Sequence, residues 1–266
     1  MTDKNNRVQS HPILSIERGE KISFKWSNQL CEGYENETIA SALMANGIHI
    51  FQFHAKDHSP QSLFCANGQC SQCMVLVDGY PKKACMELIQ EGMQIQPLEG
   101  YYTLPEFRAL DPSYPILNKH VKAMIIGAGP AGLAAAIELG KAGIETLLVD
   151  DKKQAGGKLV LQTHRFFGSK EFVYAGTRGI EIAQILASQV QSYPSVELWL
   201  NSPAVAVFSD RKIGVLKENR QYALIEPDIL LVATGAREKS LLFPGNTLPG
   251  ILGAGAFQTL LNRDWV

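Results

Sequence analysis

Four of the five cysteines lie between positions 65 and 85, and they form the most distinctive chemical pattern in the chain. Cys65, Cys70, Cys73 and Cys85 are spaced C-x4-C-x2-C-x11-C. The first three have the spacing by which one loop holds a [2Fe–2S] cluster through thiolate ligands. The segment FCANGQCSQC has small residues between its cysteines, which leaves room for backbone N–H groups to turn toward the sulfides. The pattern therefore predicts a [2Fe–2S] site with these four cysteines as ligands.

Zinc is the alternative metal for the same thiolates. Cys70 and Cys73 form a C-x2-C pair, and four thiolates would suit a tetrahedral structural zinc site. Zinc sites more often use two separate C-x2-C pairs, whereas three cysteines on one loop with one distant partner are typical of a two-iron cluster. Cys31 stands outside the pattern, and we expect it to be a small core or surface residue.

A glycine-rich segment is the second candidate for chemistry. In a G-x-G-x-x-G loop the first glycine permits a tight turn, the second lets the backbone approach a pyrophosphate, and the third lets helix and strand pack closely. The N–H groups at the start of the helix then face the anion. We expect a dinucleotide site whose loop consists of Gly127, Ala128, Gly129, Pro130, Ala131 and Gly132.

Asp150, at the end of the next apolar segment, restricts the choice of dinucleotide. Its carboxylate is placed to accept hydrogen bonds from ribose hydroxyls and would repel a 2′-phosphate, which disfavours NADP. FAD and NAD both remain compatible with these residues. We expect Asp151 to be a solvated neighbour.

Two kinds of secondary structure must position these two sites. Between positions 12 and 96, short runs of branched and aromatic residues predict strands at 13–17, 21–26, 48–53 and 74–80, with a helix over 37–47. Beyond position 120, an apolar strand at 121–129, an alanine-rich helix at 130–143 and an apolar strand at 145–151 predict a βαβ unit of a parallel sheet. Later segments predict a helix at 179–193 and strands at 196–200, 204–209 and 228–235.

This change of pattern predicts two domains. Residues 1–118 would form an α+β [2Fe–2S] domain that ends in a proline-interrupted linker, and residues 119–266 an α/β Rossmann-like domain that binds FAD or NAD. The formal net charge of −1 gives no reason to expect a nucleic-acid partner. The N-terminal segment lacks a signal peptide, and no window holds the roughly 20 apolar residues that span a bilayer. We therefore expect a cytoplasmic protein.

The first region resembles a known domain. Residues 10–97 look like a β-grasp ferredoxin domain with a short gap before the fourth cysteine. The segment VDGYPKKACM is similar to the strand, turn and fourth-ligand segment of the ferredoxin-like domains that belong to sarcosine oxidase, opine oxidase and hydrogen cyanide synthase α subunits.

The second region resembles the glutathione-reductase superfamily. Residues 154–164 and 228–238 are similar to its flavin-binding segments, which implies flavin contacts from Gly157, Lys158, Thr234 and Gly235. An exposed loop cation is the alternative role for Lys158. Residues 244–262 are also similar to the sarcosine oxidase and cyanide synthase subunits. Gln258 stands where a third glycine would be needed, so we do not expect a second dinucleotide loop.

These resemblances imply FAD rather than NAD, and an oxidoreductase that acts in an amine or amino-acid dehydrogenase or oxidase complex, on a substrate such as sarcosine, an opine, proline or glycine. The implied role is electron transfer between the flavin and the cluster, with substrate oxidation on a partner flavoprotein. In members of the superfamily the chain passes through a second Rossmann domain and then returns to complete the flavin domain. We therefore expect the flavin domain to be incomplete here, and a separate chain is one way to complete it. No acid-base catalytic residue is predicted. A reductase with its own small substrate and a non-catalytic scaffold subunit are the alternatives.

Overall fold

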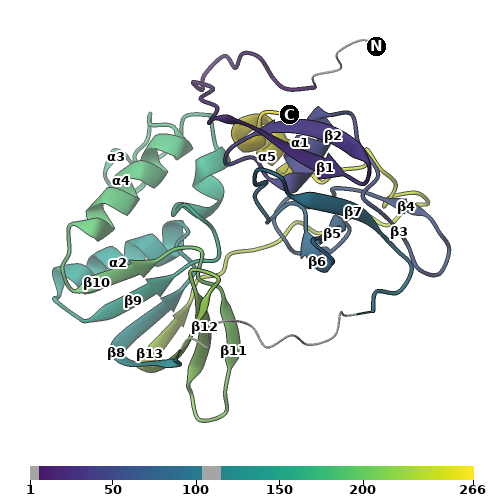
Figure 1. The fold of residues 1–266 in the computed structure, drawn as a ribbon. Coiled ribbons are helices and arrows are strands. Elements are labelled where there is room, and N and C mark those ends of the chain that lie inside the picture. Colours follow the sequence, from purple (N-terminus) through teal and green to yellow (C-terminus); the bar gives the residue numbers. More distant parts are fainter. Residues whose placement is uncertain (1–5, 104–114) are drawn as a thin grey trace. The chain divides into compact units, whose positions relative to one another are not determined.

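The computed structural model describes residues 6–103 and 115–266, so residues 104–114 of the expected linker lie outside the described residues. The chain packs into two compact units (Figure 1). Unit 1 comprises Met1–Arg108 together with Arg237–Val266, and unit 2 comprises Ala109–Ala236.

Unit 1 is built on a mixed sheet. Its described strands are β1 (Lys21–Trp26), β2 (Gln29–Tyr34), β3 (Gln52–Phe53), β4 (Pro60–Gln61), β5 (Met74–Val77), β6 (Tyr80–Lys83) and β7 (Gln94–Glu99). The main order is β2-β1-β7-β3-β4, and β5 pairs with both β6 and β7. β1 and β2 form a tight antiparallel hairpin in which Trp26 faces Gln29, whereas β1 and β7 run parallel.

Helix α1 (Ile39–Ala45) supplies one side of the unit 1 core. It begins where the Thr38 side chain accepts a hydrogen bond from the Ser41 N–H at 3.1 Å, and it ends at Asn46. Its Ile39 and Leu43 side chains are fully buried with Phe24 of β1, Phe51 and Ile95 of β7, and Met44 is partly buried against them. A mixed sheet packed against one helix confirms the predicted α+β fold.

Three predicted strands in unit 1 need correction. The segment 74–80 is strand only over Met74–Val77, because Asp78 and Gly79 turn the chain into β6. Residues 13–17 form no strand, because Nδ1 of His11 accepts hydrogen bonds from the N–H groups of Ile13 (3.1 Å) and Leu14 (3.0 Å). Those amides close a turn and are not available to a sheet ladder. In the segment 48–53 only Gln52–Phe53 is strand.

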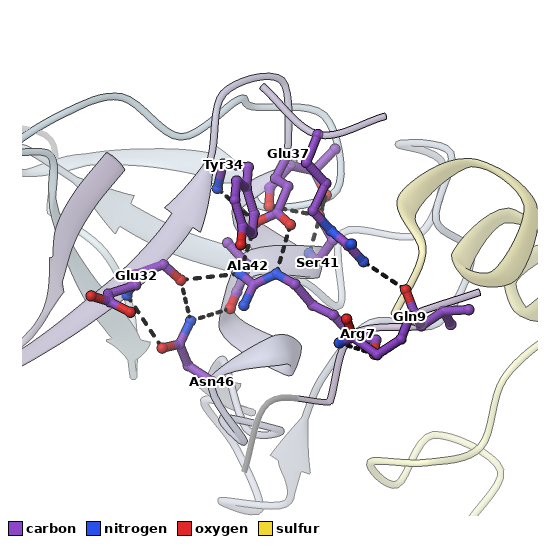
Figure 2. Close-up of polar contacts among 11 residues, drawn as sticks. Arg7, Gln9, Glu32, Tyr34, Glu37, Ser41, Ala42 and Asn46 are labelled. Atoms are coloured by element: carbon purple, nitrogen blue, oxygen red, sulfur yellow. Dashed lines mark hydrogen bonds and ion pairs between the residues drawn. The ribbon is translucent and has the colours of Figure 1, made fainter. Parts of the chain in front are cut away.

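The segment before β1 is tied to unit 1 by Arg7 (Figure 2). The guanidinium donates to both carboxylate oxygens of Glu37, at 2.8 and 2.9 Å, and to the backbone carbonyl of Glu32 at 3.0 Å. The Arg7 and Glu37 side chains are only 7% and 10% exposed. The Asn46 amide donates to the same Glu32 carbonyl at 2.7 Å. This buried, two-point ion pair holds the N-terminal segment beside the start of α1.

Unit 2 is an α/β unit. Its described strands are β8 (Leu117–Ile126), β9 (Thr146–Val149), β10 (Val196–Trp199), β11 (Ala204–Val207), β12 (Ile213–Lys217) and β13 (Gln221–Val232). They form one sheet in the order β10-β9-β8-β13-β12-β11. The first four run parallel to one another, whereas β11, β12 and β13 are joined in antiparallel pairs.

The helices of unit 2 bury one face of this sheet. The described helical segments are α2 (Pro130–Lys141), a short 3-10 turn η1 (Gly157–Leu161), α3 (Lys170–Val173) and α4 (Gly179–Gln191). Leu133 of α2 and Ile182 of α4 share a core with Ile125 of β8 and Leu148 of β9. A second core, which includes Met124 and Ile225, packs around β8, β9 and the antiparallel strands. The β8-α2-β9 segment confirms the predicted βαβ unit and the Rossmann-like fold.

The C-terminal segment packs in unit 1, whereas the sequence predicts it in the second domain, residues 119–266. After β13, the chain forms α5 (Ala254–Thr259) and a wide helical turn η2 (Leu260–Asp264). Ala256 and Leu260 are buried in the core of unit 1. Residues 237–266 therefore belong to unit 1 by packing, although they follow the Rossmann-like strands in the chain. No helix in the described parts of the chain is long and apolar enough to cross a membrane.

Candidate functional site

The four predicted ligand cysteines come from two segments of unit 1. Cys65, Cys70 and Cys73 lie on the loop between β4 and β5, and Cys85 follows β6. The β5–β6 hairpin brings the segments together, because Met74 pairs with Lys83 and the Ala84 N–H donates to the Cys73 carbonyl at 2.9 Å. Cys73 and Cys85 lie next to these paired residues, and both are buried.

The thiols influence one another's ionisation in pairs, Cys65 with Cys70 and Cys85, and Cys85 also with Cys73. All of these cysteines are free rather than disulfide-bonded. Among the described residues, no three His, Cys, Asp or Glu side chains are gathered as the ligands of one metal ion. The four sulfurs nevertheless lie close enough together to influence one another's ionisation.

That influence shows that the pocket cannot hold four thiolates unaided. Hydrogen bonds from Cys70 and Cys85 hold the pKa of the Cys65 thiol well below its ordinary value. The pKa values of Cys70 and Cys85 are raised, first because each keeps its proton in a hydrogen bond to Cys65, then because burial disfavours the thiolate, and least because a second negative charge would lie beside Cys65. A positively charged metal group removes this conflict, since metal ligation requires deprotonated thiols. The donor set thus fits the predicted cluster.

The backbone of the cysteine loop has the shape that cluster binding needs. Ala66, Gly68 and Ser71 have positive φ angles of 52°, 82° and 59°. Non-glycine residues seldom adopt this conformation, which in tight loops turns successive N–H groups toward an anion. A Cβ at Gly68 would lie 3.0 Å from both the Cγ and the Sδ of Met86. The loop is therefore closely backed on one side by Met86.

Two side chains brace this loop, and the sequence analysis did not identify either. Nζ of Lys83 donates to the Gly68 carbonyl at 2.6 Å, and Nε2 of Gln52 donates to the Ser71 carbonyl at 3.0 Å. Lys83 lies in the predicted fourth-ligand segment, but its neighbour Lys82 has the same side chain. Which of the two lysines reaches the loop depends only on the direction of its side chain from β6, and the structure supplies that direction.

The glycine loop of unit 2 lies at the N-terminus of α2, as predicted. A Cβ at Gly132 would lie 1.9 Å from the Gly127 carbonyl oxygen, and one at Gly127 would lie 2.4 Å from the Ala233 carbonyl oxygen. A Cβ at Gly129, by contrast, would meet nothing nearer than the Cα of Gly157 at 3.9 Å, so there is room for it. No side chain caps the N-terminus of α2, so its first N–H groups are available to an anion.

Asp150 lies directly against this loop. Its Oδ2 accepts a hydrogen bond from the Ala128 N–H at 2.7 Å, and its Oδ1 accepts one from the Lys152 N–H at 2.9 Å. Burial raises the pKa of Asp150, although these two N–H groups stabilise its carboxylate. Asp151 points to the surface, where it pairs with Nζ of Lys152. The structure therefore separates the two neighbouring acids as the sequence predicts.

The remaining predicted contacts surround the same loop. The Gly156 N–H donates to the Ala128 carbonyl at 2.8 Å, and a Cβ at Gly157 would lie 2.8 Å from the Cα of Gly129. Lys158 is exposed. Thr234 and Gly235 are also exposed and follow β13, whose last residue Val232 pairs with Ile126 of β8. All the predicted dinucleotide contacts thus converge at one edge of the unit 2 sheet.

Two protein-family models match the chain. Residues 19–99 match the 2Fe-2S iron-sulfur cluster binding domain, and residues 121–261 match the pyridine nucleotide-disulphide oxidoreductase family. These matches confirm the predicted cofactors, a [2Fe–2S] cluster and FAD. They also support the iron interpretation of the cysteine spacing over zinc.

Individual relatives agree with the resemblance seen in the sequence. Sarcosine oxidase subunit alpha of Rhizobium meliloti (strain 1021) is 24% identical over 93% of this chain and 31% of its own length. Hydrogen cyanide synthase subunit HcnB of Pseudomonas aeruginosa is 34% identical over 52% of this chain and 30% of its own. The crystal structure of L-proline dehydrogenase from P. horikoshii covers 96% of this chain and 49% of its own, with a TM-score of 0.78 and 23% identity, which shows a shared fold. This chain spans about a third of the length of the curated relatives.

Proposed function

Because this chain belongs to the pyridine nucleotide-disulphide oxidoreductase family and also carries a 2Fe-2S iron-sulfur cluster binding domain, we propose that it is an electron-transfer component of an amine or amino-acid oxidising complex. A bound flavin exchanges electrons in pairs or singly, and a [2Fe–2S] cluster exchanges them one at a time. A partner flavoprotein subunit would oxidise the C–N bond of the substrate. Similarity to proteins named for sarcosine and L-proline supports this substrate class.

The observation that carries the proposal is that the β5–β6 hairpin brings the fourth cysteine beside the loop that bears the other three. In this interpretation Cys65, Cys70, Cys73 and Cys85 ligate iron, and the loop amides at Ala66, Gly68 and Ser71 turn toward the cluster. Lys83 and Gln52 would hold the loop in that shape. Because the protein contributes position and electrostatics to this chemistry, no acid-base residue is needed.

At the second site the chain would bind the dinucleotide of FAD. The free N–H groups at the start of α2 would bind the pyrophosphate, and the open space at Gly129 would admit it. Asp150 would accept hydrogen bonds from the ribose. Gly157, Lys158, Thr234 and Gly235 would border the flavin. A partner subunit would carry the substrate site.

Cofactor analysis of anaerobically purified protein tests the proposal. We expect two irons and two acid-labile sulfides per chain, the composition of a 2Fe-2S cluster, together with bound FAD. The dithionite-reduced protein should give the rhombic paramagnetic resonance of a reduced two-iron cluster. Recovery of zinc without sulfide would overturn the proposal.

The electron-transfer role needs a second measurement. Rapid mixing of the intact complex with its amine substrate, followed in the flavin and cluster absorption bands, should show reduction of both centres within the turnover time. Turnover at the full rate while the cluster stays oxidised would reject a role in electron transfer. The cluster would then have a structural role.

A further inference from the structure

A lysine of β6 joins the two segments that bear the cysteines. Nζ of Lys83 donates to the carbonyl of Gly68, in the loop that bears three of them, at 2.6 Å. The Lys83 carbonyl accepts hydrogen bonds from the N–H groups of Met86 and Glu87, at 2.9 and 3.2 Å, which closes the turn that contains Cys85. Lys83 therefore holds the turn through its main chain and the loop through its side chain.

The neighbouring lysine does not share this position. Successive side chains of a strand point to opposite faces, so Lys82 lies on the face opposite to that of Lys83. Lys82 is exposed and forms an ion pair with Glu87 at 3.5 Å. Lys83 is half-buried, and within the described residues no carboxylate forms an ion pair with it. Lys83 therefore brings to the cysteine loop a positive charge that no ion pair neutralises.

We propose that Lys83 is a positioning residue that ties the cysteine loop to the Cys85 turn and raises the reduction potential of the cluster. This inference rests on the proposed function, because it takes the four cysteines as iron ligands. Reduction adds one negative charge to a cluster, so an ammonium group bound to the ligand loop favours the reduced state. Charge and hydrogen bonding around the ligands are the means by which a protein tunes such a potential.

Redox titration of the full chain, monitored by the paramagnetic resonance of the reduced cluster, tests the effect on the potential. Lys83→Met removes the ammonium but keeps an unbranched side chain. Its equilibrium constant for one-electron reduction should fall about tenfold, which corresponds to a potential lower by about 59 mV. Lys83→Arg keeps the charge and a donor, so its potential should stay close to the wild type.

Lys82→Met is the matched control, because it removes the same charge from the adjacent residue of the same strand. Its reduction constant should stay within about twofold of the wild type, since solvent and salt screen the exposed Lys82–Glu87 pair. An unshifted potential in Lys83→Met, or an equal shift in Lys82→Met, would overturn the inference.

Hydrogen exchange of the metal-free chain, measured by peptide mass spectrometry, tests the tie without any cluster. Loss of the bond to the Gly68 carbonyl should make the amides of residues 65–73 exchange about threefold faster or more in Lys83→Met. Lys83→Arg and Lys82→Met should exchange like the wild type. Unchanged exchange in Lys83→Met would show that its side chain does not hold the loop, and would overturn the inference.

A neutral variant that assembles no cluster still decides the matter. If Lys83→Met lacks the cluster, Lys83→Gln is titrated in its place against the same criteria. Cluster loss in both neutral variants but not in Lys83→Arg would support a need for the charge, and an equal loss in Lys82→Met would overturn it. Iron and sulfide content of the wild type tests the proposed function separately, because the exchange of the metal-free loop does not depend on it.

Discussion

At the residue scale, the sulfur and carboxylate groups of the two sites are held by specific neighbours. Cys65 is the thiol that the pocket already favours in its ionised form, whereas Cys70 and Cys85 resist ionisation because of it. Cys31 lies on β2 in the same buried core as Cys73 and Cys85, and burial raises the pKa of its thiol. The difference between Cys31 and the others is therefore one of surroundings and not of residue type.

Replacement of Cys70 should abolish the cluster. Cys70→Ser removes a thiolate from the loop, and we expect iron and sulfide contents below about a tenth of the wild-type values. The visible absorption of the purified protein, with iron and sulfide assays, provides the measurement. Cys31→Ser is the control and should keep the full chromophore. Equal losses in the two variants would contradict the ligand assignment.

Replacement of Asp150 should weaken dinucleotide binding. Asp150→Ala removes the charged acceptor beside the glycine loop and frees the Ala128 N–H, so we expect the dissociation constant of FAD to rise about tenfold or more. Flavin retained after gel filtration and equilibrium titration of the stripped protein provide the measurement. Asp151→Ala should bind FAD normally, because its carboxylate points to the surface. Equal retention by both variants would remove Asp150 from the site.

At the element scale, the contact between α2 and the strands on either side depends on glycine. Gly132 and Gly127 pack so closely that a Cβ on the former would overlap the carbonyl oxygen of the latter. Gly129 is different, because space and not packing surrounds its missing side chain. The same three-glycine pattern therefore contains residues that maintain the fold and one that leaves room for a ligand.

Alanine substitutions should separate these two functions. Gly132→Ala should lower the free energy of unfolding by about 3 kcal/mol, since neither the helix nor the Gly127 carbonyl can move away without strain. Gly129→Ala should cost about 1 kcal/mol or less, yet impair FAD binding. Thermal unfolding of the apoprotein and flavin titration provide the two measurements. A Gly129→Ala variant that binds FAD as tightly as the wild type would show that the pyrophosphate lies elsewhere.

At the scale of the whole molecule, the cofactor sites belong to units with separate cores. The cysteines lie within the unit 1 core, and the glycine loop adjoins a unit 2 core formed by Ile125, Leu133 and Leu148. Unit 1 also contains both ends of the described chain, since the Val8 N–H donates to the Trp265 carbonyl at 2.9 Å. Loss of the metal should therefore affect the two units unequally.

Iron removal should loosen unit 1 and spare unit 2. Without metal the crowded thiols lose the group that links the loop to Cys85, so amide protection should fall in β5, β6 and α5 by about tenfold or more. Protection in β8 and β9 should change little. Hydrogen exchange before and after anaerobic chelation, followed by peptide mass spectrometry, measures both. A uniform loss of protection over the two units would contradict the independence of their cores.

Much of the local chemistry could be predicted from the chain alone. Three of the cysteines lie within one loop, and the glycines lie within one turn, so covalent connectivity keeps each group together in any compact fold. The strand before the glycines and the helix after them were predicted from an apolar run and an alanine-rich segment. Strands such as β12 were not predicted, because a short run with a glycine has no clear period.

Spacing and residue type by themselves determined the two cofactor classes and the two fold classes, because those depend on neighbours along the chain. Only the tertiary structure decided which distant groups meet: Arg7 with Glu37, Lys83 with the Gly68 carbonyl, and Leu260 with the buried core that contains Cys85. Such contacts join residues that are far apart in sequence, and no local pattern encodes them. They form because burial of the apolar core brings those segments together and leaves each buried polar group to find a partner.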